Sequence, residues 1–274
     1  MINQDMHTLD NILVVKLGGS SGLDLAASCD DLAALAADRP LVVVHGVSAL
    51  ANRLCEEAGR PVRTLTSPSG HTWRYTDAAT RDIYARAAGA INAEIVSRLR
   101  ERGRCAVGLA DAGVVRGERK TAVRAVVNGR VCVIRDDYTG SITGVDAAKL
   151  FELLRAGCVP VVPPLAASPD GPLNVDGDRA AAAVAAALGA AELVILSNVR
   201  GLYRSYPDES SLVSLVRQHE LERALEWAGG RMKRKVLGAR EALAGGVRRV
   251  ILGDGRVASP VQRALTGHGT VFAP

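Results

Sequence analysis

Short runs of apolar, mostly branched residues alternate along the chain with longer segments in which Ala and Leu recur at helical spacing. Residues 12–17 and 41–44 are short apolar runs, typical of strands buried on both faces of a sheet. Segments of helical period follow them at 23–37 and 48–58. This strand–helix–strand–helix opening predicts an α/β fold built around a parallel sheet.

The same alternation continues to the carboxyl end of the chain. Further helices are predicted at 78–101, 147–156, 179–188, 221–227 and about 232–244, and further strands at 105–109, 159–162, 193–196 and 250–252. No low-complexity linker or short repeat separates these elements. We therefore expect one domain made of two lobes, about 1–172 and about 173–274.

Two segments depart from this pattern. Residues 60–77 are rich in Pro, Ser, Thr and Gly and have no clean period, which predicts a functional loop or a small hairpin. Residues 114–138 alternate apolar and polar positions around Asn128-Gly129, a dipeptide that favours the tight turn of a β-hairpin. The cations of this second segment include Arg116, Arg119, Lys120, Arg124 and Arg130. We expect a basic hairpin.

The composition suits such a fold and argues against two other classes of protein. Hydrophobic residues make up 48% of the 274 residues and aromatic residues only 3%, which disfavours a nucleic-acid platform of stacked bases. The formal net charge of +5 is a mild excess that suits an anionic ligand or an acidic protein partner, and it falls short of a DNA-binding face. No apolar run is long enough to span a bilayer. We expect neither nucleic acid nor a membrane as a partner.

The cysteines indicate a reducing compartment. Their number is odd, at Cys29, Cys55, Cys105, Cys132 and Cys158, and no pair is spaced as C-x-x-C. This pattern predicts reduced and mostly buried thiols in a cytoplasmic protein, without a zinc site. The histidines are scattered and indicate no metal site either.

The first candidate site is the glycine turn after the first predicted strand, where Lys16 precedes Gly18-Gly19. Glycines let backbone N–H groups approach a phosphate, the following helix offers its positive N-terminus, and the lysine adds a cation. The same residues also fit a solvated lysine beside a tight turn. No Walker A sequence occurs in the chain.

The second candidate site is Gly229-Gly230, which is followed by four cations in the five residues 231–235. At a predicted helix N-terminus these charges oppose the helix dipole, so helix stability does not explain them. They indicate either an anionic ligand or a solvated basic face.

Other polar positions remain ambiguous from spacing alone. Arg74 suits bidentate capture of a carboxylate but also fits a surface arginine in a polar loop. Asn174 and Asp178 flank the turn into an Ala-rich helix, where both fit a helix cap, and Asp178 is also placed to orient lysines or a metal. His45 ends the second predicted strand, and we assign it no acid–base role.

Taken in their order along the chain, these motifs resemble those of the amino acid kinase family, and the resemblance covers nearly the whole chain, from residue 12 to about 271. The likeness is carried by the glycine loop after Lys16, the His45-Gly46 turn and the segments NVDGD, SNVRGLY and GRMKRK. Within the family the chain looks nearest to the acetylglutamate kinase branch. It looks nearer still to enzymes acting on aminoadipate or glutamate whose α-amino group is attached to an amino-group carrier protein. The stretches that point there are HGVSALAN, SPSGHTWRYTD, RKTAV with DYTG, and GRMKRKV.

The resemblance implies a fold, a reaction and its participants. The fold is a three-layer αβα sandwich with a mainly parallel central sheet, in which the first lobe holds the small substrate and the second the nucleotide. The reaction is phosphorylation of the substrate's side-chain carboxylate by ATP with Mg²⁺, giving an acyl phosphate in lysine- or arginine-type amino acid biosynthesis. The chain would form a homodimer. An acidic carrier protein would dock on the basic hairpin, unless that hairpin is an ordinary exposed one.

The resemblance also implies individual roles. Lys16 and Lys235 correspond to lysines that stabilise the transferring phosphoryl group, and Asp178 to the acid that organises them. The implied substrate-binding residues are His45, Gly46, Arg74 and Asn174. The implied nucleotide- and phosphate-binding residues are Gly18, Gly19, Ser197, Asn198, Gly201 and Tyr203. The implied docking residues are Arg116, Arg119, Lys120, Arg124 and Arg130.

One position departs from the family pattern. Val47 follows His45-Gly46, where the family usually has a second glycine. A Cβ at this position is expected to narrow the approach of substrate or γ-phosphate. Two alternatives stay open: a kinase of free N-acetylglutamate with the same catalytic residues, and a non-catalytic nucleotide- or amino-acid-binding regulator on the kinase fold. The retained catalytic residues argue against the second.

Overall fold

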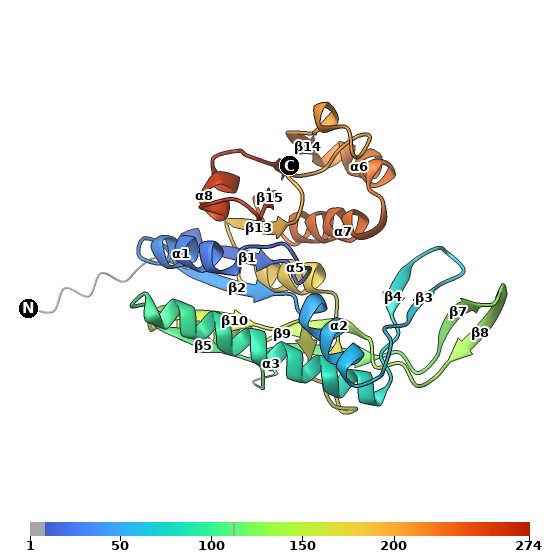
Figure 1. The fold of residues 1–274 in the computed structure, drawn as a ribbon. Coiled ribbons are helices and arrows are strands. Elements are labelled where there is room, and N and C mark those ends of the chain that lie inside the picture. Colours follow the sequence, from blue (N-terminus) through green and yellow to red (C-terminus); the bar gives the residue numbers. More distant parts are fainter. Residues whose placement is uncertain (1–8, 112) are drawn as a thin grey trace, which may run out of the picture.

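The computed structural model describes residues 9–111 and 113–274, and a twisted sheet of eight strands forms the centre of that part of the chain. The strands are β1 (Leu13–Leu17), β2 (Leu41–His45), β5 (Ala106–Gly108), β10 (Val159–Val162), β13 (Glu192–Ser197), β14 (Leu215–Arg217), β15 (Arg249–Asp254) and β16 (Thr270–Ala273). Their order is β14-β16-β15-β13-β1-β2-β10-β5, and β15 with β16 is the antiparallel pair among these neighbours (Figure 1). The predicted mainly parallel sheet is confirmed.

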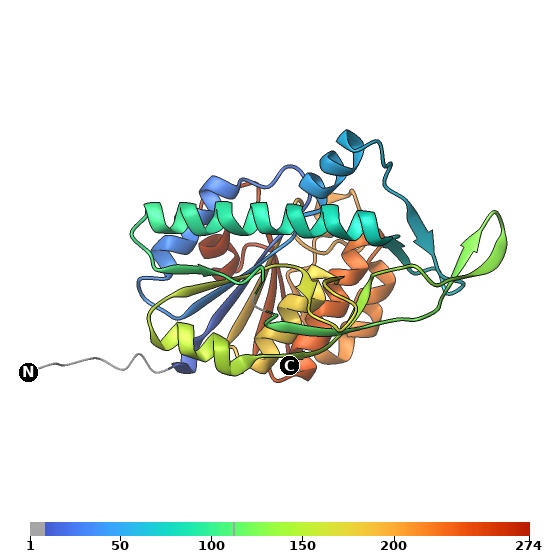
Figure 2. The ribbon, with the colours of Figure 1, turned by 90° about the horizontal axis from the view of Figure 1, so that it is seen from below.

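Helices cover both faces of this sheet (Figure 2). On one face lie α1 (Leu25–Leu35), α3 (Ala78–Glu101) and α8 (Pro260–Leu265), and on the other α4 (Ala147–Arg155), α5 (Gly177–Ala187) and α7 (Gly230–Ala244). Successive side chains of a strand point to opposite faces, so Leu13 and Val15 pack with the first group while Val14 packs with the second. The three-layer sandwich is therefore confirmed. Over residues 9–111 and 113–274, none of the helices is both long and apolar enough to cross a membrane.

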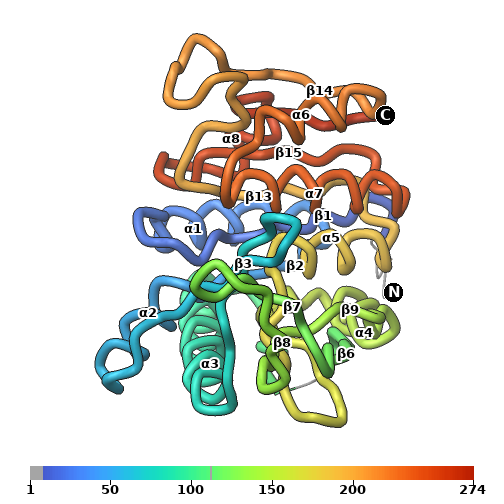
Figure 3. Tube along the Cα trace, turned by 90° about the vertical axis from the view of Figure 1, so that its right-hand side faces the viewer, coloured from blue at the N-terminus to red at the C-terminus, as the bar shows by residue number. Residues whose placement is uncertain are grey.

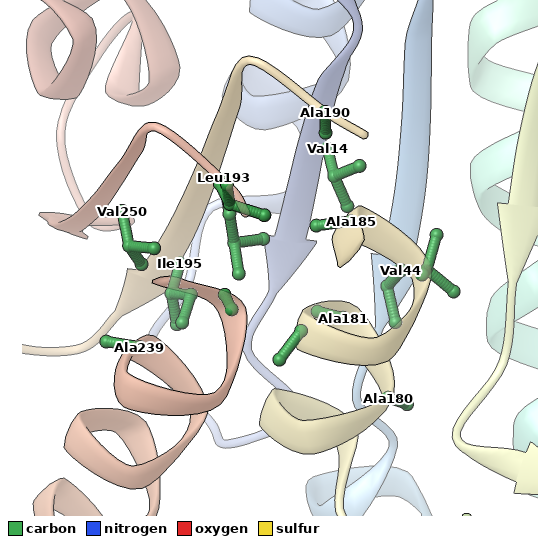
Figure 4. Close-up of a cluster of buried hydrophobic side chains, with 14 of the residues drawn as sticks. Val14, Val44, Ala180, Ala181, Ala185, Ala190, Leu193, Ile195, Ala239 and Val250 are labelled. Atoms are coloured by element: carbon green, nitrogen blue, oxygen red, sulfur yellow. The ribbon is translucent and has the colours of Figure 1, made fainter. Parts of the chain in front are cut away.

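Small residues bring α5 and α7 close to the sheet and to each other. Figure 4 shows Ala181 and Ala185 of α5 and Ala239 of α7 among the apolar side chains of the strands. A Cβ on Gly238 of α7 would lie only 3.2 Å from the backbone oxygen of Asp178 in α5. Because this approach leaves so little room, the first turn of α5 is held against the middle of α7.

A smaller antiparallel sheet, which we call the arm, projects from the body beside the carboxyl ends of the central strands (Figures 1 and 3). The arm consists of β3 (Thr64–Thr66), β4 (Thr72–Arg74), β7 (Val123–Val127) and β8 (Arg130–Ile134), in the order β4-β3-β7-β8. Asn128 and Gly129 both have positive φ, 50° and 75°, as the tight turn between β7 and β8 requires. The hairpins expected over 60–77 and around Asn128-Gly129 are confirmed.

The basic hairpin expected over 114–138 is wrong as a single element. β6 (Val115–Arg119) pairs instead with β9 (Gly140–Val145), a strand that the sequence pattern did not predict. Alternation of polar and apolar residues indicates a strand but does not say which strand is its partner. The cations are consequently divided: Arg116 and Arg119 lie in the β6–β9 ribbon, Lys120 in a connection, and Arg124 and Arg130 on the arm.

The expectation of reduced cysteines is wrong for one pair. Cys105 and Cys158 form a disulfide, with their Cα atoms 4.5 Å apart. Each precedes one of two adjacent parallel strands, β5 and β10, in which Ala106 pairs with Val159. The sheet register therefore joins cysteines that are 53 residues apart in sequence. Of the free cysteines, Cys29 and Cys55 are buried and Cys132 is exposed.

Replacing Cys105 and Cys158 together by Ser is expected to lower the free energy of unfolding by about 2–4 kcal/mol, because the bond restricts the unfolded chain. Urea denaturation measures this change. Wild type should lose the same stability when it is reduced, whereas the double variant should be insensitive to reductant. Equal midpoints for oxidised wild type and the variant would contradict a stabilising role for the bond.

Candidate active site

A cavity of about 1130 Å³ lies where β1, β2 and β13 end, between the arm and α7. Ligands of open parallel sheets bind beyond the carboxyl ends of the strands, so this is the expected place for a site. The predicted site residues that line it are Lys16, Gly18, Gly19, Gly46, Arg74, Lys120, Asn174, Asp178, Ser197, Asn198, Tyr203 and Lys235. The fold thus brings together positions from both halves of the chain.

Three charged side chains form the centre of the cavity wall. Asp178 Oδ1 lies 2.8 Å from Lys16 Nζ, and Asp178 Oδ2 lies 3.1 Å from Lys235 Nζ. All three residues are at most 9% exposed. One carboxylate therefore holds two cations together, and the group carries a net positive charge at the cavity surface.

The electrostatics of this group favour the ionised form of Asp178. Burial would raise the pKa of Asp178, but the charges of Lys16 and Lys235 and their hydrogen bonds outweigh burial and hold that pKa far below its usual range. Burial lowers the pKa of Lys235, as does the charge of Lys16, and Asp178 acts in the opposite direction. A further anion beside the two lysines would balance the second cation.

The start of α5 differs from the prediction in one respect. The helix cap is Asp176, whose carboxylate accepts hydrogen bonds from the backbone N–H groups of Asp178 (2.9 Å) and Arg179 (3.1 Å). Asn174 lies in β12 (Leu173–Asn174), and Asp178 lies in the first turn of the helix, so neither is the cap. Because Asp176 supplies the cap, the side chain of Asp178 is left to pair with the lysines.

The two glycine turns beside Lys16 are in direct backbone contact. A Cβ on Gly19 would lie 2.3 Å from the backbone nitrogen of Val47, and a Cβ on Gly46 would lie 2.5 Å from the backbone nitrogen of Gly19. The Ala49 N–H also donates to the Gly19 carbonyl at 2.7 Å. Glycine is therefore required at both positions for packing, in addition to any approach of a phosphate.

His45 lies behind this turn, outside the cavity lining. Its side chain is buried, and burial together with the charge of Lys16 lowers its pKa to about 4 despite a bond to the Gly46 carbonyl. Asn92 Nδ2 lies 3.1 Å from His45 Nε2 and donates to the Val161 carbonyl at 2.9 Å. The neutral imidazole thus fixes the turn, and the sequence pattern gave no signal for Asn92.

Val47 borders the cavity, but its side chain is committed to packing. It is 2% exposed and belongs to a buried cluster with Ala51, Tyr84 and Ala87. Its φ of −139° is ordinary for a residue with a Cβ. Val47 therefore lines the cavity with a side chain that packs mainly into this cluster, and narrowing of the cavity by its Cβ stays a prediction.

The opposite wall carries Arg74, at the end of β4. Its guanidinium donates to Asn52 Oδ1 and lies over the ring of Tyr84. Arg74 Nη1 is buried and has no hydrogen-bond partner among the described residues. A buried N–H of a cation without a partner is costly, so this atom is suited to an anionic ligand.

The wall formed by β13 and α7 has an aromatic margin. Ser197 ends β13, Asn198 follows it, and Tyr203 and Tyr206 meet edge to face at 5.7 Å. The predicted site residue Gly201 lies behind this wall: a Cβ there would meet Thr270 Oγ1 at 2.4 Å, so this glycine serves packing. The lining residues that sequence reasoning missed here include Tyr206, Trp227 and Met232.

Arg119 has a structural position and is not free to dock a partner. Its guanidinium donates to the backbone carbonyls of Asp137 (2.9 Å) and Arg135 (2.7 Å) and stacks on the ring of Tyr138 at 3.9 Å. Arg116, Lys120, Arg124 and Arg130 are exposed. We therefore do not include Arg119 among the residues proposed to dock a partner.

Comparison with known proteins gives consistent matches. A model of the amino acid kinase family matches residues 11–254. The LysW-aminoadipate kinase of Deinococcus radiodurans is 49% identical over 268 residues, covering 96% of this chain and 92% of that protein. The LysW-aminoadipate kinase of Thermus thermophilus is 45% identical over 267 residues, covering 95% and 99%.

A solved structure supports the fold. N-acetylglutamate synthase from Neisseria gonorrhoeae, complexed with coenzyme A and N-acetyl-glutamate, has a TM-score of 0.79 and 27% identity to this chain. The match covers 97% of this chain but 60% of the synthase chain. The chain thus spans about three fifths of that protein.

Asp178→Asn is expected to lower the free energy of unfolding at pH 7 by about 3–5 kcal/mol, because two buried cations lose their counter-charge. Lys235→Met leaves Lys16 and Asp178 as an ion pair without net charge, so this variant should lose less free energy of unfolding. Since the folded pKa of Asp178 is depressed, its contribution is present above pH 4 and fades as the pH falls below the ordinary carboxyl value. Urea denaturation between pH 3 and 7 measures both effects, and a larger loss for Lys235→Met would contradict this account.

Proposed function

The chain belongs to the amino acid kinase family, and we propose that it phosphorylates the side-chain carboxylate of 2-aminoadipate or glutamate linked through its α-amino group to an amino-group carrier protein. The product is an acyl phosphate of lysine- or arginine-type biosynthesis. The observation that carries the proposal is the buried group Lys16–Asp178–Lys235, which lies between a wall with a partnerless arginine N–H and a wall with an aromatic margin.

The proposed chemistry needs no general base. A side-chain carboxylate has an ordinary pKa of about 4.3, so it is ionised at neutral pH and attacks the γ-phosphorus directly while ADP leaves. The obstacle is the approach of one anion to another. Lys16 and Lys235 supply positive charge where negative charge develops on the transferring oxygens, and Asp178 holds both lysines in place. This role agrees with a neutral, buried His45 that is not among the lining residues of the cavity.

We propose that Mg²⁺ accompanies the ATP. Among residues 9–111 and 113–274, no three His, Cys, Asp or Glu side chains gather closely enough to hold a metal ion. Phosphate oxygens and water would therefore supply most of its ligands, as is common for this ion. When bound, Mg²⁺ would neutralise phosphate charge, while the chain itself contributes the two lysines.

We assign the carboxylate substrate to the wall of Arg74 and the nucleotide to the wall of Ser197 and Tyr203. This agrees broadly with a substrate lobe at about 1–172 and a nucleotide lobe at about 173–274. The division is incomplete, because Asn174 borders the proposed substrate site while Lys16 and its glycine turn come from the first lobe. Both lobes share one sheet, in which β1 pairs with β13.

We also propose a cytoplasmic homodimer, as the family resemblance implies. An ATP-dependent biosynthetic reaction suits the cytoplasm. Disulfides are uncommon there outside certain thermophiles, so the bond between Cys105 and Cys158 is the feature at odds with this location.

The carrier protein is proposed to dock on the exposed cations Arg116, Lys120, Arg124 and Arg130. Lys120 also borders the cavity, so a partner held on this surface is near the proposed substrate site. An acidic carrier would be attracted by the positive charge, which acts mainly on the rate and orientation of docking.

The proposal is tested by trapping the acyl phosphate with hydroxylamine while ATP consumption is followed. Turnover is expected with aminoadipate or glutamate linked to the carrier protein, and not with free N-acetylglutamate. Turnover with the free compound alone would instead identify a kinase of N-acetylglutamate. ATP binding without turnover on any of these substrates would indicate the regulatory alternative.

Reversing two charges on the arm, Arg124→Glu with Arg130→Glu, is expected to raise KM for the carrier-linked substrate at least several-fold and leave KM for ATP unchanged. The salt dependence of that KM should also fall, because screened charge pairs are lost. The control is Arg248→Glu. Arg248 is exposed and immediately precedes the amino end of β15, whereas the arm lies beside the carboxyl ends of the central strands. Equal KM values in the arm variant and the control would contradict docking on this surface.

A further inference from the structure

The two proposed substrate ligands, Arg74 and Asn174, are joined through one buried hydroxyl. Thr76, two residues after Arg74, is fully buried. Its Oγ1 donates to the Arg74 carbonyl at 3.0 Å and accepts from Asn174 Nδ2 at 3.0 Å. A single side-chain oxygen thus links the backbone of one ligand to the side chain of the other.

The carboxylate of Asp137 holds Thr76 in place from the other side. It is 1% exposed, and its Oδ1 accepts from the backbone N–H groups of Thr76 (3.3 Å) and Thr139 (3.0 Å). Its Oδ2 accepts from Trp73 Nε1 at 2.5 Å. Trp73 and Thr139 both line the cavity, whereas Thr76 and Asp137 are absent from its described lining.

Backbone bonds complete the connection. Tyr138 N–H donates to the Thr76 carbonyl at 2.7 Å, and the Asn174 N–H donates to the Tyr138 carbonyl at 3.0 Å. Three segments that are far apart in sequence, at 73–76, 137–139 and 174, are therefore tied at one buried point. We call Thr76 and Asp137 with these bonds the hub.

We propose that the hub sets the geometry of substrate binding: Thr76 and Asp137 are positioning residues that fix Arg74 and Asn174 for the acceptor carboxylate substrate. This inference rests on the proposed function of the cavity. It assigns a role to two residues that do not reach the cavity themselves. The hub contacts the arm and the β12 segment but not the lysine group, so it should affect acceptor binding and leave nucleotide binding unchanged.

The hydroxyl of Thr76 can be removed with little change elsewhere. Thr76→Val keeps the side-chain shape and both backbone bonds of residue 76, but it loses both bonds made by Oγ1. The side-chain amide of Asn174 then loses its hydrogen bond to residue 76, so its orientation is no longer fixed by that bond. Thr76→Ser is the matched variant, because it retains the hydroxyl.

Steady-state kinetics on wild type and both variants test the proposal. In Thr76→Val, KM for the carrier-linked acceptor is expected to rise about tenfold, which corresponds to about 1.4 kcal/mol. KM for ATP should stay within about twofold, and Thr76→Ser should restore KM for the acceptor to near the wild-type value. Equal acceptor KM in the Val and Ser variants would overturn the proposal, as would a parallel rise in KM for ATP.

A crystal structure of Thr76→Val provides a test that does not depend on turnover. The side chain of Asn174 is expected to leave its wild-type position, and the backbone at Arg74 to shift or become less ordered. Wild-type positions for both would overturn the role of the hub. If wild type itself fails to turn over any acceptor, the proposed function fails, and this structural comparison still decides whether the hub positions the two residues.

Discussion

The structure depends on a single buried carboxylate that forms ion pairs with two lysines from distant parts of the chain. Burying either lysine without Asp178 would cost several kcal/mol, because an unpaired cation would be taken out of water. Lys16 comes from a central strand, Asp178 from the first turn of α5 and Lys235 from α7. The sheet and the two helices must therefore be placed accurately for the ions to pair. The ion pairs therefore require the apolar packing of the sheet and helices, and that packing must in turn leave the three charged groups in contact.

Close approach of backbone segments is what makes this placement possible. Gly238 lets α7 lie against the backbone of Asp178, and Gly19 and Gly46 let two turns meet beside Lys16. The Ala-rich inner face of α5 has the same effect against the sheet. These small residues look like generic loop or helix residues in the sequence, but here the glycines lack a Cβ that would clash with a neighbouring backbone, and the alanines let α5 lie close to the sheet.

Much of the fold could be predicted from the sequence, and the reasons follow from chain geometry. Continuous apolar runs and strong helical periods predicted six strands of the central sheet and helix α3, whose bounds match the prediction at both ends. The short strands β14 and β16 at one edge of the sheet were not predicted. The disulfide and the partner of β6 were missed because they depend on register between distant strands, which a local pattern does not contain. The positions of Lys16 and Lys235 were found because glycine turns and cations at a helix start are local signals. Asn92 and the hub were missed, since their roles exist only through contacts that form in the folded chain.

Val47 shows how a departure from a family pattern is judged by its surroundings. A second glycine after Gly46 would permit a positive φ, but the φ of Val47 is −139°, so the backbone here does not require glycine. The side chain fills a pocket between α2 (Ser48–Glu57) and α3, where Ala51 and Ala87 are small enough to receive it. Valine thus adds buried apolar area at the start of α2, while its backbone lies close enough to Gly19 that a Cβ on that glycine would be 2.3 Å from the Val47 nitrogen. The substitution consequently alters packing beside the phosphate turn and leaves the group of two lysines and one carboxylate intact, which favours a catalytic chain over a regulatory one.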